Sequence, residues 1–97
     1  MYKNNNKEKI KKFIKLIEHY CSIQERCKQD VINKIKSWGL KDDFKFMMLE
    51  KLTNEGFINE IRYVKLFCRS KIRLNKWGRI KINNELIKKN ISQDIIQ

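Results

Sequence analysis

The scarcity of helix-breaking residues is the feature that most constrains how this chain can fold. Its 97 residues include no Pro and only three Gly, the two residue types that most strongly interrupt helices. The stretches between the glycines are rich in Lys, Ile, Leu, Asn and Glu. Because few turn signals interrupt them, these stretches favour helices over short strands. We therefore expect an all-α protein.

Apolar residues at three-and-four spacing divide the chain into about five helices plus the start of a sixth. The expected helices cover approximately residues 7–23, 28–38, 42–55, 60–74 and 78–89, and Ser92 is the expected cap of the sixth. Asn59 is the expected N-cap of the fourth helix. We expect the following side chains of the first three helices to be buried: Ile10, Phe13, Ile14, Ile17, Tyr20, Cys21, Val31, Ile32, Ile35, Trp38, Phe44, Met47, Met48 and Leu52.

A weak internal repeat with an offset of 51 residues suggests tandem three-helix units. The matched pairs are Val31 and Ile82, Ile35 and Leu86, Gly39 and Asn90, Leu40 and Ile91, and Asp43 and Asp94. Asn tolerates the left-handed backbone of a helix stop better than other non-Gly residues, so Gly39 and Asn90 fit the same role. Chance similarity between two amphipathic helices is the alternative.

The repeat predicts a disordered N-terminus at 1–6, a first three-helix unit at 7–56 and a second at 57–97. The second unit looks incomplete, because the sequence stops where its third helix begins. A helix start this short is unstable alone, so we expect Ser92–Gln97 to fray or to continue into further residues.

The chain is strongly basic, with a net charge of +12 and a pI near 9.8. Such a balance implies attraction to nucleic acid, to an acidic protein surface or to a membrane surface. Part of the Lys excess can reflect codon composition, but four of the five Arg lie in the segment 62–79. Arg binds phosphate and carboxylate through a planar fork that Lys lacks. The clustering therefore suggests directed anion recognition.

The basic residues of the fourth helix are expected to form a stripe. Arg62, Lys65, Arg69 and Arg73 share one arc of a helical wheel, opposite an apolar arc formed by Ile61, Val64, Phe67, Cys68 and Ile72. The predicted partner-binding or DNA-binding residues are Arg62, Lys65, Arg69, Arg73, Lys76, Trp77, Arg79 and Lys81. An ordinary solvated helix face is the alternative explanation.

Three aromatic or basic positions leave a choice between packing and binding. Trp38 closes a helix and is expected in the core, whereas Trp77 either packs against the second unit or presents its ring to a ligand. Lys71 falls inside the apolar arc, where it either extends past its neighbours to solvent or meets a specific acceptor.

No catalytic centre, cofactor site or metal site is expected. The spacing of His19 from Cys21 and Cys27 matches no known zinc site, and no nucleophile has an evident base. The three Gly are isolated, so no phosphate-binding loop exists.

The location suggested by the sequence is the cytoplasm. Three cysteines without a CxxC unit indicate reduced thiols, and the polar N-terminus does not resemble a signal peptide. No window approaches the roughly 20 apolar residues of a transmembrane helix. We expect a monomer with no membrane partner.

Three segments of the chain resemble the RecX family of recombinase regulators. They are EGFINEIRYVKLFCRSK (Glu55–Lys71), KWGRIKINNELIKKNIS (Lys76–Ser92) and YCSIQERCKQDVINKIKSWGL (Tyr20–Leu40). The third is similar to the first repeat of the family, with Cys27 where a small capping residue is usual, a substitution that weakens the cap. The family usually has a third unit, so the chain resembles its N-terminal two-thirds.

The resemblance implies tandem three-helix units that bind in the groove of the RecA nucleoprotein filament and restrain its recombinase and coprotease activities. The implied partners are the RecA filament and single-stranded DNA reached through it, and the implied contact is the basic face predicted above. A stand-alone basic DNA-binding module is the main alternative and predicts tight binding to bare duplex. A structural helical adaptor, the third possibility, predicts no salt-sensitive partner.

Overall fold

The computed structural model describes the backbone of residues 2–96 and the side chains of residues 8–96. Within these residues all regular structure is helical, which confirms the expected fold class. The helices are α1 (Tyr2–Ile23), α2 (Lys28–Ser37), α3 (Asp42–Asn54), α4 (Glu60–Asn75), α5 (Arg79–Lys88) and α6 (Gln93–Ile96). The expected disorder of 1–6 concerns side chains outside the described residues and stays a prediction.

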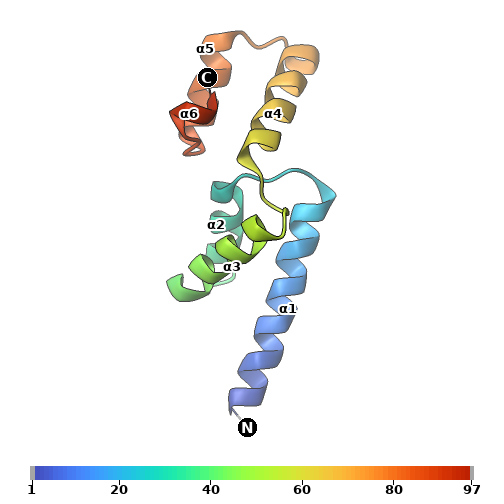
Figure 1. Ribbon diagram of the computed structural model, residues 1–97, viewed down its shortest axis with the longest axis vertical. Coiled ribbons are helices and arrows are strands. Elements are labelled where there is room, and N and C mark those ends of the chain that lie inside the picture. The colour runs from blue at the N-terminus through green and yellow to red at the C-terminus, as the bar shows by residue number, and fades with distance from the viewer. Residues whose placement is uncertain (1, 97) are drawn as a thin grey trace.

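The molecule is elongated, with α1, α2 and α3 at one end and α4, α5 and α6 at the other (Figure 1). Its principal extents are 55 × 23 × 22 Å and its radius of gyration is 15.5 Å. A compact domain of this length has a radius of gyration of about 13 Å. The extended shape exposes much of each helix.

The first hydrophobic core lies between α1, α2 and α3. Its fully buried side chains are Ile17, Val31, Ile35, Met48 and Leu52. The rings of Phe13 and Trp38 lie 5.2 Å apart at its edge, so the expected packing of Trp38 is confirmed.

The second core lies between α4, α5 and α6 and includes one residue from outside them. Its buried members are Cys27, Tyr63, Val64, Ile82, Leu86 and Ile91. Cys27 precedes α2 in the chain and is 0% exposed. The second core is therefore closed by a side chain that the first three helices supply.

The two groups of helices repeat at the offset of 51 residues expected from the sequence. Helix α5 begins and ends 51 residues after α2, and α6 begins 51 residues after α3. The stops that follow α2 and α5 both have left-handed backbone, with φ of +73° at Gly39 and +60° at Asn90. The common helix stop is thus confirmed.

Four residues expected on buried faces are exposed. The exposed fractions are 38% at Ile10, 45% at Met47, 57% at Ile61 and 55% at Ile72. Three helices cover only one side of each neighbour, whereas the expected apolar arcs were wider than that contact.

The C-terminal segment forms a helical turn, which differs from the expected fraying. Ser92 Oγ accepts a hydrogen bond from the N–H of Asp94 at 3.2 Å, which confirms the expected cap. Ile95 and Ile96 are half-buried against the second core. Packing against α4 and α5 therefore stabilises a helix that is too short to persist alone.

Replacing Asn90 tests the left-handed stop. Asn90→Ala is expected to lower the free energy of unfolding by about 1–2 kcal/mol, because Ala is strained at positive φ. Asn90→Gly is expected to cost less, since Gly adopts this backbone freely and only the side-chain hydrogen bond to Gln29 is lost. Urea denaturation measures both. Equal losses would assign the effect to the hydrogen bond instead.

Candidate partner-binding surface

The predicted basic row begins on a well-capped helix. Asn59 Oδ1 accepts a hydrogen bond from the N–H of Arg62 at 3.0 Å, which confirms Asn59 as the N-cap of α4. Lys65, Arg69 and Arg73 follow at four-residue spacing, which places them along one side of the helix. All three are exposed, and no carboxylate of the described residues lies within ion-pair distance of them.

Arg62 begins the predicted row but is held by contacts inside the protein. Its Nε donates to Glu25 Oε2 at 2.6 Å, and its Nη2 donates to the carbonyl of Gly56 at 3.0 Å. The guanidinium thereby joins the α1–α2 connection and the α3–α4 connection to the first turn of α4. Glu25 lies 37 residues away in sequence, so periodicity could not reveal this pair.

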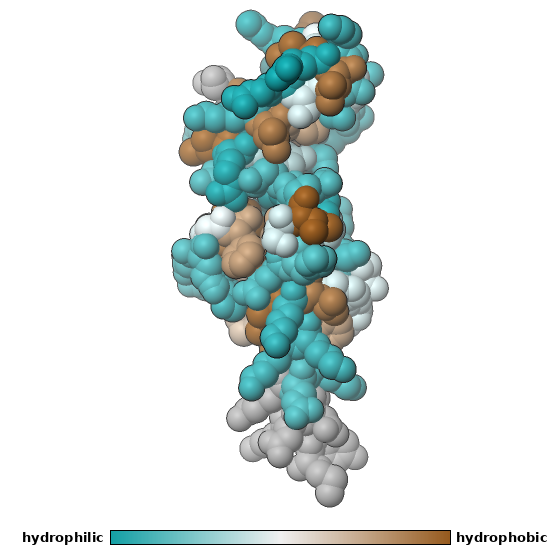
Figure 2. Space-filling model, turned by 90° about the vertical axis from the view of Figure 1, so that its right-hand side faces the viewer, coloured by the Kyte–Doolittle hydropathy of each residue, from teal (hydrophilic) through white to brown (hydrophobic). Residues whose placement is uncertain are grey.

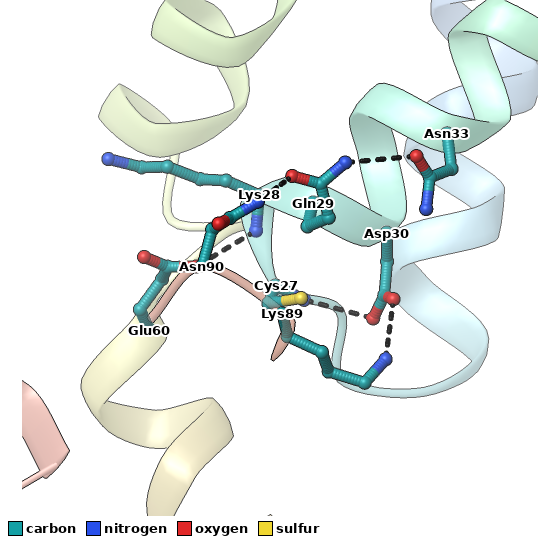
Figure 3. Close-up of polar contacts among 8 residues, drawn as sticks. All are labelled: Cys27, Lys28, Gln29, Asp30, Asn33, Glu60, Lys89 and Asn90. Atoms are coloured by element: carbon teal, nitrogen blue, oxygen red, sulfur yellow. Dashed lines mark hydrogen bonds and ion pairs between the residues drawn. The ribbon is translucent and has the colours of Figure 1, made fainter. Parts of the chain in front are cut away.

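The N-terminus of α2 is the junction between the two groups of helices (Figure 3). The carboxylate of Asp30 accepts from Lys89 Nζ at 2.9 Å and from the N–H of Cys27 at 3.3 Å. The N–H of Lys28 donates to Glu60 Oε2 at 3.0 Å. Burial opposes the charged form of Lys89, but its bond to Asp30 prevails and raises the pKa of the ammonium.

Three polar contacts to residues 28–30 therefore come from elements beyond residue 59. The third joins Asn90 Nδ2 to Gln29 Oε1 at 2.6 Å. Carboxylates at a helix N-terminus are favoured by the helix dipole, which adds to the stability of this junction.

Cys27 performs a different task from the weakened cap expected for it. Its side chain packs in the second core, and the capping acceptor for its own N–H is Asp30. A small, apolar residue suits this site because Tyr63 and Val64 pack in the same cluster.

The turn between α4 and α5 gathers the remaining predicted residues. Lys76 has a left-handed backbone with φ of +58°, and the N–H of Trp77 donates to the carbonyl of Lys71 at 3.1 Å. This closed turn ends α4 after Asn75, where the sequence predicted a break. Lys76, Arg79 and Lys81 are exposed around it.

Trp77 combines the two roles considered for it. The ring is half-buried and meets Phe67 edge-on, with centroids 6.3 Å apart. Lys71 Nζ and Lys81 Nζ lie 4.7 Å and 4.4 Å from the Trp77 ring centroid. Lys71 therefore finds its acceptor in aromatic faces, which attract cations through the ring quadrupole.

The candidate surface consequently consists of a row and a cluster. The row is Lys65, Arg69 and Arg73 along α4. The cluster is Lys76, Trp77, Arg79 and Lys81 at the α4–α5 turn. Among these seven residues only Trp77 is substantially covered.

The described residues contain no arrangement that holds a metal. No group of three or more His, Cys, Asp or Glu side chains lies close enough to share an ion within that part of the chain. His19 is exposed, apart from such a group. Burial raises the pKa of the Cys21 thiol to about 11 and also raises that of Cys27, which makes both poor nucleophiles.

No helix among the described residues has the length and apolar character needed to cross a bilayer.

Comparison with known proteins agrees with the geometry. Residues 59–97 match the family described as RecX, second three-helix domain. The regulatory protein RecX of Streptococcus uberis is 30% identical over 96 residues, and that of Prosthecochloris aestuarii is 28% identical over 78. This chain belongs to the RecX family.

The relatives are longer than this RecX-family chain. The match covers 80% of this chain and 52% of the Prosthecochloris protein, and 93% of this chain and 37% of the Streptococcus protein. A crystal structure of a regulatory protein RecX superposes with a TM-score of 0.85 at 24% identity, covering 95% of this chain and 46% of that one. That structure shows that the fold is shared.

Removing the Arg62 side chain separates its structural contacts from the exposed row. Arg62→Ala is expected to lower the free energy of unfolding by about 1–2 kcal/mol, because charged hydrogen bonds are lost, although partial exposure weakens them. Arg69→Ala is expected to stay within about 0.5 kcal/mol of wild type. Urea denaturation compares them, and a larger loss at Arg69 would contradict these assignments.

The three thiols are expected to differ in reactivity. At pH 8 a thiol with a pKa near 11 is ionised in only about one molecule in a thousand, so Cys21 should be alkylated slowly. Cys68 is half-buried, whereas Cys21 and Cys27 are buried, so Cys68 should react with iodoacetamide first. Mass spectrometry of timed digests measures the order. Labelling of Cys21 at the rate of Cys68 would show that the first core opens readily.

Proposed function

We propose that this protein binds the RecA–DNA filament and restrains recombinase activity, as a regulator of DNA repair and recombination without a catalytic centre of its own. The observation that carries the proposal is the exposed basic row on α4 of a RecX-family chain. Partner binding through Lys65, Arg69 and Arg73 would use the only long cationic side of α4 that the described contacts leave free.

Charge and shape support this proposal together. A nucleoprotein filament presents phosphates and acidic side chains, and a net charge of +12 speeds encounter with such a surface. An elongated body of 55 Å lies along a groove more readily than a sphere of equal mass does. Bound there, it would block addition of protomers or access of a second DNA strand.

We also propose that 7–56 and 57–97 act as two three-helix units. Each group of helices has its own core, while Cys27 and the bonds to residues 28–30 limit their relative movement. A stiff pair of units would fit one filament geometry better than a flexible pair.

The proposal is tested with the double variant Arg69→Ala plus Arg73→Ala. Loss of both guanidinium groups is expected to weaken binding to filaments of RecA on single-stranded DNA about tenfold, equal to about 1.4 kcal/mol. Fluorescence anisotropy across a salt series measures this, and inhibition of strand exchange should fall in parallel. The matched control is Lys11→Ala plus Lys15→Ala, with the same spacing and charge change on exposed positions of α1.

The result also decides between the proposal and a stand-alone DNA-binding module. Preference for the filament over bare DNA supports the proposal. Equal or tighter binding to bare duplex, with a logarithmic salt slope of about −0.9 per neutralised phosphate, would make the chain a DNA-binding module. No salt-sensitive binding to either would leave a structural adaptor.

A further inference from the structure

The internal repeat reveals which face of each unit receives a neighbour. In the first unit that face is the segment before α2 and its first turn, residues 25–30. Glu25 binds Arg62, the N–H of Lys28 binds Glu60, and Asp30 binds Lys89. All three partners belong to the second group of helices.

The equivalent face of the second unit is open. Counting 51 residues on, Glu25 corresponds to Lys76, Lys28 to Arg79, and Asp30 to Lys81. Gln29, which binds Asn90, corresponds to Ile80. Ile80 is 78% exposed, and its neighbour across the turn, Leu74, is 80% exposed, so the positions covered in the first unit are uncovered here.

The substitutions change what this face can bind. Lys76 and Lys81 replace two acids, so a neighbour must bring carboxylates where Arg62 and Lys89 stood. The N–H at Arg79 still calls for the acceptor that Glu60 provides at Lys28, because Gly78 has no side chain to cap α5. Ile80 in place of Gln29 calls for an apolar contact instead of an amide.

We propose that the α4–α5 turn and the first turn of α5 form a docking face for an acidic protein surface with an apolar side chain at its centre. This deepens the proposed function and rests on it: the acidic surface belongs to the protein component of the filament. Lys76, Arg79 and Lys81 bind its carboxylates, while Ile80 and Leu74 cover its apolar centre. The row on α4 remains available for other anions.

A second copy of this chain does not fit the face. The part of α1 that corresponds to the start of α4 is residues 8–12, which contain three Lys and one Glu. Head-to-tail stacking would bring these cations against Lys76 and Lys81. Like charges in contact oppose association, so the repeat does not extend itself.

Bare nucleic acid fits the face less well than protein does. Phosphates could bind the three cations, but they would leave Ile80 and Leu74 in water. Exposed apolar side chains rimmed by charge are typical of protein-binding sites.

The experiment compares Ile80→Ser with Ile61→Ser, a matched control whose side chain is also exposed, at 57%, near the other end of α4. Fluorescence anisotropy measures binding of each full chain to RecA filaments on single-stranded DNA and to the same DNA alone. Ile80→Ser is expected to weaken filament binding about tenfold, because an apolar contact is lost, and to leave DNA binding unchanged. Ile61→Ser should change neither.

A second pair of variants tests the charges. Lys76→Glu plus Lys81→Glu should weaken filament binding more than Lys11→Glu plus Lys36→Glu, an equal change in net charge at exposed positions of α1 and α2. Circular dichroism confirms that each variant remains helical.

The outcomes separate the two proposals. If the wild type binds filaments and Ile80→Ser binds as tightly, the docking face is wrong while the proposed function stands. If the wild type binds no filament, the proposed function is wrong and the docking face is lost with it. Equal weakening of bare DNA binding by Ile80→Ser, or wild-type dimers in sedimentation that this variant dissociates, would also overturn the docking face.

Discussion

The rest of the structure depends on the closure of one helix N-terminus by residues from the other end of the chain. The first turn of α2 exposes backbone N–H groups that need acceptors, and the carboxylates of Asp30 and Glu60 supply them. Glu60 lies in the first turn of α4, so capping α2 also positions α4. Asp30 in turn holds Lys89 at the end of α5. One capping problem thereby fixes how the two groups of helices meet.

Cys27 couples this polar junction to the apolar core. Its backbone N–H belongs to the cap of α2, while its side chain is a fully buried member of the second core. Moving the second group away from α2 would expose that core and break the bonds to Glu60 and Lys89 together. The two cores therefore depend on each other, although each is built mainly from its own three helices.

The repeat conserves the geometry of the units while exchanging their chemistry. Arg26 lies 3.7 Å from the ring centroid of Tyr20, and Lys71 lies 4.7 Å from that of Trp77. At the offset of 51 residues, Tyr20 corresponds to Lys71 and Arg26 to Trp77, so the cation and the ring have traded places. The same contact joins the first helix of each unit to the residue before the next helix.

The helices and their stops could be predicted from the sequence because their signals are local. Asn59, Gly39 and Asn90 act through their own backbone and immediate neighbours, and all three have the expected roles. Arg62 could not be separated from the basic row, since the residue that distinguishes it, Glu25, lies on another element. Cys27 presented the same difficulty. Periodicity assigns a face to a side chain, but only tertiary contact shows what meets that face.

The distribution of acids explains why the basic surface is left free. The chain has 11 acidic residues, yet none lies between Glu60 and Glu85. Glu60 binds the N-terminus of α2, and Glu85 pairs with Lys88. The cations from Lys65 to Lys81 thus have no acidic neighbour in sequence, and the nearby acids Glu25 and Asp30 bind Arg62 and Lys89. Screening at physiological salt acts over about 8 Å. Cations at four-residue spacing on one helix lie within that length of one another, so they present a combined field to a partner.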